Sequence, residues 1–217
     1  MTIIAIVGSK GGSGKTTLAV SIAAELKRRG ASVLLGDVDP QGSALAWAAQ
    51  ASSNGHEAPT TVRLGEGFHR PGQLSRLAEP FDWTILDTPP HGGTTLRAAL
   101  SVADIALLPV TPSPLDLWAL GDTLQTISEA EAFRPTLRAG LVLNRTARTA
   151  VASRARSSLP TTGLPIVGEL GARVAFVEAF ATGQGVTVYA PGSDAAREVS
   201  ALVDAISTFG AVKQHVA

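Results

Sequence analysis

Residues 9–17 read Ser9-Lys10-Gly11-Gly12-Ser13-Gly14-Lys15-Thr16-Thr17, a glycine-rich loop that carries two lysines. An apolar, β-branched run precedes the loop at residues 2–7, and residues 18–29 have helix-forming composition with Gly30 behind them. Strand, glycine loop and helix in this order indicate a phosphate-binding loop, because backbone N–H groups at the start of such a helix close around an anion. A flexible Gly/Ser turn is the simpler alternative. We therefore expect a site for a nucleoside triphosphate.

Two side chains of the loop supply the chemistry that such a site needs. Lys15 stands where a P-loop lysine reaches the β- and γ-phosphates, and Thr16 offers a hydroxyl to Mg²⁺. The strict pattern G-x-x-x-x-G-K-[ST] fails by one residue, because Ser9 occupies the place of the first glycine and Gly8 lies one position earlier. Lys10 is surplus to a site that already has one lysine, so it is either a solvated loop residue or has a separate role.

Acidic residues follow two further apolar runs. Asp37 and Asp39 belong to the segment D-V-D-P-Q-G at residues 37–42, and Asp87 ends the run that begins at Trp83. The carboxyl ends of strands are where a doubly wound sheet places its chemistry. Asp87 there fits an acid that holds Mg²⁺ through water. The alternatives are a plain Asp-x-Asp-Pro turn at residues 37–40 and, for Asp87, a cap on the following helix.

Composition limits the class of protein. The chain has 217 residues, of which 45% are hydrophobic and only 17% charged, which is typical of strands buried on both faces. We expect one domain over residues 1–217. Cysteine is absent, so disulfides and thiolate metal sites are excluded. No apolar run approaches the length of a membrane span and no signal peptide is recognisable, so we expect a cytoplasmic protein.

The formal net charge is zero, but the charges are unevenly distributed. Half of the fourteen arginines lie between residues 132 and 177, where Glu169 is the only acidic residue. Arginine suits phosphate recognition because its planar fork holds two oxygens at once. Ordinary solvated arginines on a strand and a helix are the alternative. The seven are Arg134, Arg138, Arg145, Arg148, Arg154, Arg156 and Arg173.

The order of the expected elements predicts the fold class. Strands are expected at residues 2–7, 32–38, 82–87, 104–110, 137–144 and 165–169, with a short one at 61–64, and helical stretches separate most of them. This alternation predicts an α/β fold with a doubly wound, mostly parallel sheet and helices on both faces. The last helix is expected at residues 193–209, with Ser193 as its N-cap.

The loop sequence K-G-G-S-G-K-T-T resembles the deviant Walker A motif of the ParA/MinD family of ATPases. In that family two subunits sandwich two ATP molecules, so the resemblance implies an ATP-dependent homodimer. It also implies that Lys10 of one subunit contacts the phosphates bound by the other, as a dimerisation sensor and a charge stabiliser. By the same resemblance Asp39 positions or activates the attacking water, and Asp37 helps to organise the magnesium shell.

Two other segments extend the resemblance along the chain. Residues 109–116 are similar to the strand-to-helix turn of the small partition ATPases often called ParF, and Asn144 ends a strand where the family often contacts adenine. The catalytic residues implied are Lys10, Lys15 and Asp39, and the metal ligands are Thr16, Asp37 and Asp87. The residues expected to hold ATP are Lys10, Gly11, Gly12, Ser13, Gly14, Lys15, Thr16, Thr17 and Asn144.

The resemblance implies a positioning ATPase that uses ATP and Mg²⁺ and is associated with the nucleoid. Non-specific DNA is the expected partner, with Arg145, Arg148, Arg154, Arg156 and Arg173 as candidate contacts. The expected cargo is a plasmid or chromosome that carries a ParB-type adaptor. A protein assembly such as a chemoreceptor cluster or a carboxysome is the closest alternative, and a P-loop biosynthetic ligase or a regulatory nucleotide-binding module are others.

Two absences narrow the expectation within the family. The phosphate loop begins at Ser9, so we expect no N-terminal helix-turn-helix domain and no autorepression. Residues 208–217 contain one lysine and are too short for a basic amphipathic membrane helix, so we expect no membrane partner.

Overall fold

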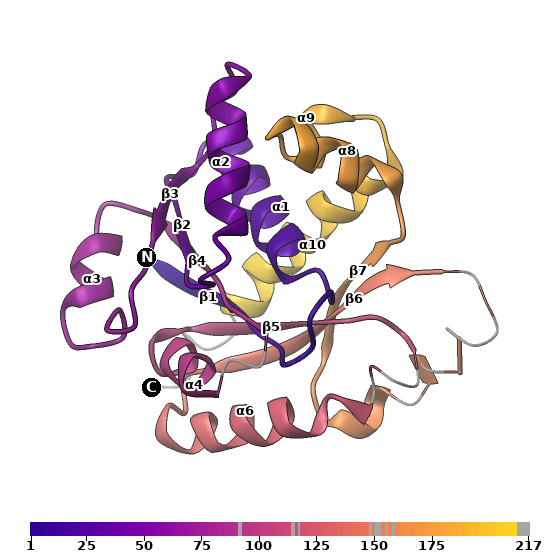
Figure 1. Ribbon diagram of the computed structural model, residues 1–217. Coiled ribbons are helices and arrows are strands. Elements are labelled where there is room, and N and C mark those ends of the chain that lie inside the picture. Colours follow the sequence, from indigo (N-terminus) through magenta and orange to yellow (C-terminus); the bar gives the residue numbers. More distant parts are fainter. Residues whose placement is uncertain are drawn as a thin grey trace.

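A computed structural model describes residues 1–90, 93–113, 116, 118–147, 149, 153–154, 156–157 and 159–211. Within these residues seven strands form one sheet in the order β3-β2-β4-β1-β5-β6-β7, and every neighbouring pair is parallel (Figure 1). The expected doubly wound fold is confirmed, with a sheet that is parallel throughout. The strands are β1 (Thr2–Ile6), β2 (Val33–Asp37), β3 (Thr60–Arg63), β4 (Trp83–Asp87), β5 (Ile105–Val110), β6 (Arg138–Thr146) and β7 (Ile166–Gly171).

Helices cover both faces of the sheet (Figure 1). On one face lie α1 (Lys15–Arg28), α2 (Ser43–Ser53), α8 (Val174–Thr182), α9 (Val186–Tyr189) and α10 (Asp194–Ala211). On the other lie α4 (Gly93–Val102) and α6 (Gly121–Phe133), while α3 (Gln73–Ala78) precedes β4 and a 3-10 turn occupies Leu159–Thr162. Helix α1 begins at Lys15, three residues before the expected start, so the Lys-Thr-Thr of the loop forms its first turn. None of the described helices is long and apolar enough to cross a membrane.

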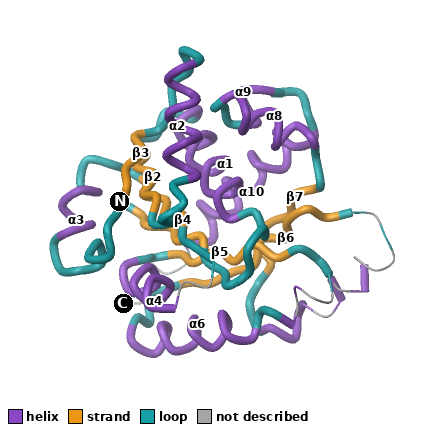
Figure 2. The backbone as a smooth tube through the Cα atoms, in the orientation of Figure 1, coloured by secondary structure: helices purple, strands orange, loops and turns teal. Residues whose placement is uncertain are grey.

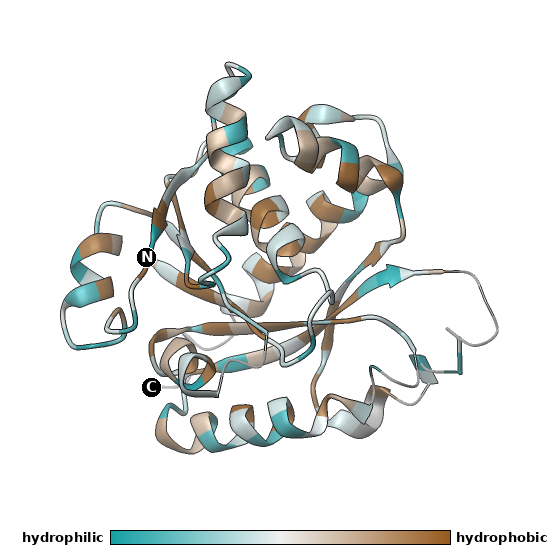
Figure 3. Cartoon of the chain, viewed as in Figure 1, coloured by the Kyte–Doolittle hydropathy of each residue, from teal (hydrophilic) through white to brown (hydrophobic). Residues whose placement is uncertain are grey.

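Successive side chains along a strand point to opposite faces of the sheet, so the strands contribute to two separate hydrophobic cores, one on each face. In β1, Ile4 and Ile6 belong to the cluster under α1 and α10, while Ile3 and Ala5 belong to the cluster under α4 and α6. All four are buried, and brown runs along the central strands in Figure 3. Two-sided burial therefore explains why the central strands β1, β2, β4 and β5 are apolar at nearly every position.

Strand β1 is the topological switch point of the sheet, where the order in which strands are added reverses. It lies between β4 and β5, so the chain builds one edge of the sheet first and then returns to build the other. In such sheets a ligand binds in the crevice outside the carboxyl end of the strand at the switch point. Figure 2 shows the loop that leaves β1 and enters α1 at this place. The fold thus puts the glycine-rich loop where a ligand is expected.

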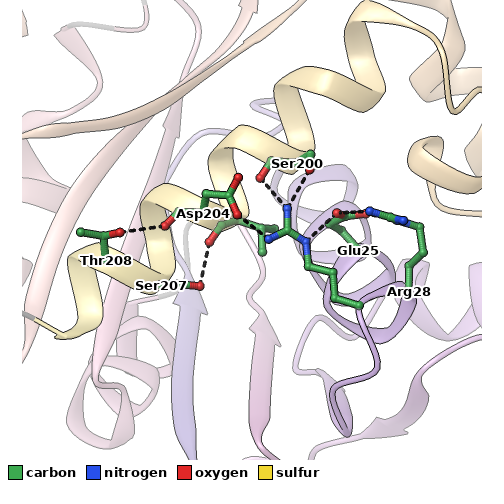
Figure 4. Close-up of polar contacts among 8 residues, drawn as sticks. Glu25, Arg28, Ser200, Asp204, Ser207 and Thr208 are labelled. Atoms are coloured by element: carbon green, nitrogen blue, oxygen red, sulfur yellow. Dashed lines mark hydrogen bonds and ion pairs between the residues drawn. The ribbon is translucent and has the colours of Figure 1, made fainter.

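An ion-pair network built around the buried carboxylate of Glu25 ties the end of α1 to α10 (Figure 4). Glu25 is fully buried and accepts hydrogen bonds from Arg28 at 2.7 and 2.8 Å and from Arg29 at 2.7 Å. Arg29 also pairs with Asp204 and donates to the Ser200 carbonyl oxygen at 2.8 Å. Burial alone would raise the pKa of Glu25, but the two arginines outweigh it and lower the pKa to about 2.

The start of α10 follows the expected pattern. The Ser193 hydroxyl accepts a hydrogen bond from the Ala196 N–H at 3.1 Å, and the helix begins at Asp194. Ser193 is therefore the N-cap, as predicted. The helix runs to Ala211, and residues 212–217 lie outside the described part of the chain.

Candidate functional site

The backbone explains why Ser9 is tolerated at the position of the first glycine of the strict motif. Gly8 adopts φ +152°, and the only described non-glycine residue with positive φ is Arg145, so Ser9 has an ordinary backbone. The Ser9 N–H donates to the Thr123 hydroxyl and its own hydroxyl donates to the Ala119 carbonyl oxygen, both at 3.2 Å. Gly8 thus supplies the unusual conformation, and Ser9 fastens the loop to the start of α6.

Asn144, at the end of β6, clamps the loop from the opposite side. Its amide Nδ2 donates to the Ser13 carbonyl oxygen at 2.7 Å, and its Oδ1 accepts from the Arg145 N–H at 3.0 Å. A methyl group at Gly14 would lie 2.2 Å from Nδ2, and Gly14 has φ +89°, so glycine is required there on both counts. Both polar atoms of Asn144 are used within the chain, and its predicted contact with adenine stays a prediction.

Lys15 is buried at the centre of the loop. Its ammonium donates to the Lys10 carbonyl oxygen at 3.0 Å, a position that a phosphate oxygen could take over. Burial lowers the pKa of Lys15, while the nearby Asp87 and Asp39 carboxylates act to raise it. Lys15, Asp87 and Asp39 are therefore gathered at one place, as the sequence predicts.

Asp37 and Asp87 lie side by side because β2 and β4 are paired in register at these residues. Asp37 accepts hydrogen bonds from the N–H groups of Asp39 at 3.1 Å and Leu45 at 3.0 Å, which link β2 to the following loop and to α2. Burial raises the pKa of Asp37, and these bonds together with the charge of Arg63 partly offset the rise. Both Asp37 oxygens thus accept backbone hydrogen bonds, one from the loop and one from the first turn of α2.

Both carboxylate oxygens of Asp87 are buried without a hydrogen-bond partner. Burial raises the pKa of Asp87 to about 7, with Asp37 and Asp39 adding to the rise and Thr16 beside it opposing. A buried carboxylate without a partner calls for a cation, and Mg²⁺ binds through one or two carboxylates plus water and phosphate. In the described residues no three acidic or histidine side chains gather as a metal cage. Asp87 and Thr16 therefore fit Mg²⁺ that arrives with a phosphate.

Asp39 lies half-buried at the mouth of the site. Its Oδ1 accepts a hydrogen bond from the Gln41 N–H at 2.9 Å, which closes a tight turn before α2. Because its charge acts on both Lys15 and Asp87, the carboxylate is near the place where a terminal phosphate would lie. That position suits a group that orients a water molecule.

Lys10 pairs within its own chain with Asp116, a buried residue that follows β5. The Lys10 side chain remains partly exposed, with 45% of its surface accessible. Asp116 ends the segment 109–116 that resembles the ParF-type turn, of which residues 114–115 lie outside the described part of the chain. Sequence alone had assigned no chemistry to Asp116, since it lies 106 positions from Lys10.

A cavity of about 700 Å³ opens beside the loop, within the range of about 300–1,000 Å³ for small-molecule sites. Most of its surface is apolar, with Val174, Phe176 and Phe180 contributed by α8. The loop contributes Gly14, Thr16 and Thr17, and β6 contributes Asn144 and Arg145. The size and lining suit a base and sugar attached to phosphates held by the loop.

Most arginines of the basic region are already engaged. Arg156 pairs with Glu169, and Arg173 pairs with Glu198 at 2.7 Å. Arg134 pairs with Asp104 at 2.8 Å, and Arg138 lies over the Phe209 ring at 4.4 Å. The DNA contacts predicted from the sequence stay predictions, and the region is less basic than its sequence indicates. Of the other candidates, Arg145 lines the cavity, Arg154 has a contact within the chain, and Arg148 lies outside the described residues.

A comparison with known protein families matches most of the chain, including the glycine-rich loop and the aspartates Asp37, Asp39 and Asp87. The model of the CobQ/CobB/MinD/ParA nucleotide-binding domain matches residues 4–186. A relative from Halothiobacillus neapolitanus, maintenance of carboxysome distribution protein A, is 36% identical over 210 residues, which cover 94% of this chain and 95% of that protein. The chromosome-partitioning ATPase Soj from Thermus thermophilus is 32% identical over 162 residues, covering 62% of this chain and 65% of Soj.

A solved structure supports the fold over the full length. The ATP complex of a single-residue variant of Cyanothece McdA superposes with a TM-score of 0.73 at 19% identity, covering 100% of this chain and 99% of that one. At this identity the likeness concerns the fold alone.

Proposed function

The chain belongs to the CobQ/CobB/MinD/ParA nucleotide-binding family, and on this premise we propose that it is a Mg²⁺-dependent ATPase that positions a cellular cargo. ATP holds two copies together as a sandwich dimer that binds nucleoid DNA without sequence preference. A partner on the cargo stimulates hydrolysis, and the dimer then separates and leaves the DNA.

The observation that carries the ATPase assignment is the buried, partnerless carboxylate of Asp87 beside Lys15. In the proposed complex Lys15 exchanges the Lys10 carbonyl oxygen for phosphate oxygens, and Asp87 and Thr16 hold Mg²⁺. The bound Mg²⁺ neutralises phosphate charge. Asp39 orients the attacking water, which matters because the loose transition state of phosphoryl transfer depends on positioning more than on a strong base.

Lys10 supplies the dimer switch in this proposal. The Lys10 side chain is partly exposed, and its ammonium reaches the phosphates held by the second copy, where it stabilises the charge that develops on the leaving phosphate. Within one copy it is paired with Asp116, so dimer formation requires this pair to open.

The cargo that the comparisons favour is a protein assembly of the carboxysome type. The similarity to the carboxysome-distribution protein extends over nearly the whole of both chains, whereas the similarity to Soj covers less than two thirds of this one. This reverses the order expected from the sequence, which placed a plasmid or chromosome first. Partition of DNA through a ParB-type adaptor is the second candidate, supported by the similarity to Soj.

ATP turnover with a variant of Asp39 tests the enzyme assignment. Asp39→Ala is expected to bind ATP as the wild type does and to lose turnover, because the water is no longer oriented. Both can be measured, by calorimetry and by phosphate release. Equal turnover in the two proteins would remove Asp39 from the mechanism.

DNA binding tests the positioning function. Binding is expected only with ATP, and if about four phosphates are neutralised, a fourfold rise in salt lowers the affinity roughly a hundredfold. DNA binding that ignores ATP, or its absence at low salt, would count against the proposal. A biosynthetic ligase of the same family would instead consume ATP with a small carboxylate substrate and need neither DNA nor a protein activator.

A further inference from the structure

Arg63 reaches from the edge of the sheet over the loop that carries Asp39. It is the last residue of β3 and is paired in register with Asp37 at the end of β2. Its Nη1 lies 3.4 Å from the Pro40 carbonyl oxygen, to which it donates. A methyl group at Gly42 would lie 2.6 Å from its Nη2. The guanidinium therefore rests on the backbone of residues 40–42.

The loop beneath Arg63 is also held from the side of the sheet and by its own turn, in which Asp39 accepts hydrogen bonds from the N–H groups of Gln41 and Gly42, both at 2.9 Å. Asp37 accepts the N–H groups of Asp39 and Leu45, which fixes the two ends of the segment. Between these ends Pro40 and Gln41 are exposed, and Gly42 adopts φ +67° before α2 begins. Arg63 thus adds a contact on the outer surface of this segment, at Pro40 and Gly42.

In the described part of the chain Arg63 forms no ion pair, and its charge acts only at longer range on Asp37. An exposed arginine on an edge strand can serve simply to keep that edge from pairing with other chains. Such an arginine would extend into solvent, however, whereas this one folds back onto the loop.

We infer that Arg63 is a positioning residue for ATP hydrolysis, which holds the segment 39–42 so that the Asp39 carboxylate stays directed at the phosphate site. The inference rests on the proposed ATPase function. Arg63 lines neither the phosphate loop nor the cavity beside it, so it acts through Asp39 rather than on the nucleotide. Losing it loosens the loop and misplaces the water, while the grip of the P-loop on ATP is unchanged.

The test separates turnover from binding in Arg63→Ala and Arg63→Met. Both are expected to lower kcat for basal ATP turnover about tenfold, because misplacement of a catalytic group by a fraction of an ångström has effects of this size. KM and the affinity for ATP change less than about twofold, because the phosphate loop is untouched. Arg63→Lys, which keeps one charged donor for Pro40, recovers part of kcat. Arg63→Met keeps an aliphatic side chain of similar length, so it removes the charged donor with little change in packing. A thermal melt of every variant checks that it is folded.

Arg76→Ala is the matched control. Arg76 is also an exposed arginine of this edge region, but its guanidinium lies over Gly72 in its own segment, 3.4 Å from where a methyl group would stand, and not over the Asp39 loop. It is expected to turn over ATP as the wild type does. If both Arg63→Ala and Arg63→Met kept the wild-type kcat, the inference would be overturned while the proposed function would stand. The same holds if Arg76→Ala lowered kcat as much as the Arg63 variants do. A wild-type chain without ATP turnover would overturn the proposed function, and the inference with it.

Discussion

The Nζ atom of Lys10 pairs with the carboxylate of Asp116 in the same chain. Asp116 is buried and Lys10 is partly exposed, so the pair draws a loop cation toward the body of the molecule. At the same time the Lys10 carbonyl oxygen accepts the ammonium of Lys15 at 3.0 Å. Both lysines of the loop are therefore paired inside one copy. In the proposed dimer, phosphate oxygens would replace the Lys10 carbonyl oxygen at Lys15, and the phosphates of the second copy would replace Asp116 at Lys10.

Asp116→Asn is expected to favour the dimer. The neutral amide holds Lys10 more weakly than the carboxylate does, so breaking this contact on dimer formation costs less free energy. We expect half-maximal dimer formation at a severalfold lower protein concentration with saturating AMPPNP, as measured by sedimentation velocity. Asp122→Asn, at the exposed start of α6, is the control and should match the wild type. A weaker dimer in Asp116→Asn would mean that Asp116 aims Lys10 outward instead of restraining it.

Asn144→Ala is expected to weaken nucleotide binding without changing base preference. Losing the bond to Ser13 releases the phosphate loop from β6, so that ordering the loop around the phosphates costs more on binding; we expect roughly tenfold weaker affinity, about 1.4 kcal/mol. ATP and GTP should lose the same factor in titration calorimetry, because the defect lies in the phosphate loop. Asn54→Ala removes a similar bond, to the Thr182 carbonyl oxygen at 2.9 Å, and should not affect nucleotide binding. A loss confined to ATP would instead assign Asn144 to the base.

Glu25→Gln is expected to destabilise the fold by about 2 kcal/mol, because it weakens the charge-assisted hydrogen bonds to the two arginines, while solvent partly screens the guanidinium groups that remain. The folded-state pKa of Glu25 is about 2, below its ordinary value of 4.5, so the unfolded chain binds the proton more readily. The stability that Glu25 contributes is thus complete above pH 4.5 and is lost as the pH falls toward 2.

Denaturant unfolding of wild type and Glu25→Gln between about pH 7 and about pH 3 measures this contribution. The difference between the two should shrink as the pH falls. Glu57→Gln is the control, because Glu57 is largely exposed and its ion pair with Lys27, at 3.4 Å, lies at the surface. A difference that stays constant with pH would show that the lost stability does not come from the charge of Glu25.

The sequence predicted the parts of the site that follow from strand ends. Asp37 and Asp87 each end an apolar run, and parallel strands bring such ends together, so their proximity could be expected. The loop and its lysines follow from local sequence in the same way. The replacement of the first glycine by Ser9 was unexplained until the backbone showed that Gly8 takes the positive φ.

The remaining features depend on contacts between distant segments. The role of Asn144 requires β6 to end against the loop, and Asp116 and Arg63 meet their partners only in the folded chain. The net charge of the arginine-rich region also depends on contacts between distant segments. Glu198, which pairs with Arg173, belongs to α10 and lies outside the stretch in which the charges were counted.

The most direct test of the proposed dimer switch compares the wild type with Lys10→Ala and Lys15→Ala by sedimentation velocity and calorimetry. The wild type is expected to form a dimer with AMPPNP and to remain a monomer with ADP. Lys10→Ala should bind AMPPNP yet stay monomeric, because the contact across the dimer is missing, while Lys15→Ala should fail to bind. A wild type that stays monomeric with saturating AMPPNP, or a Lys10→Ala variant that dimerises as the wild type does, would contradict the account.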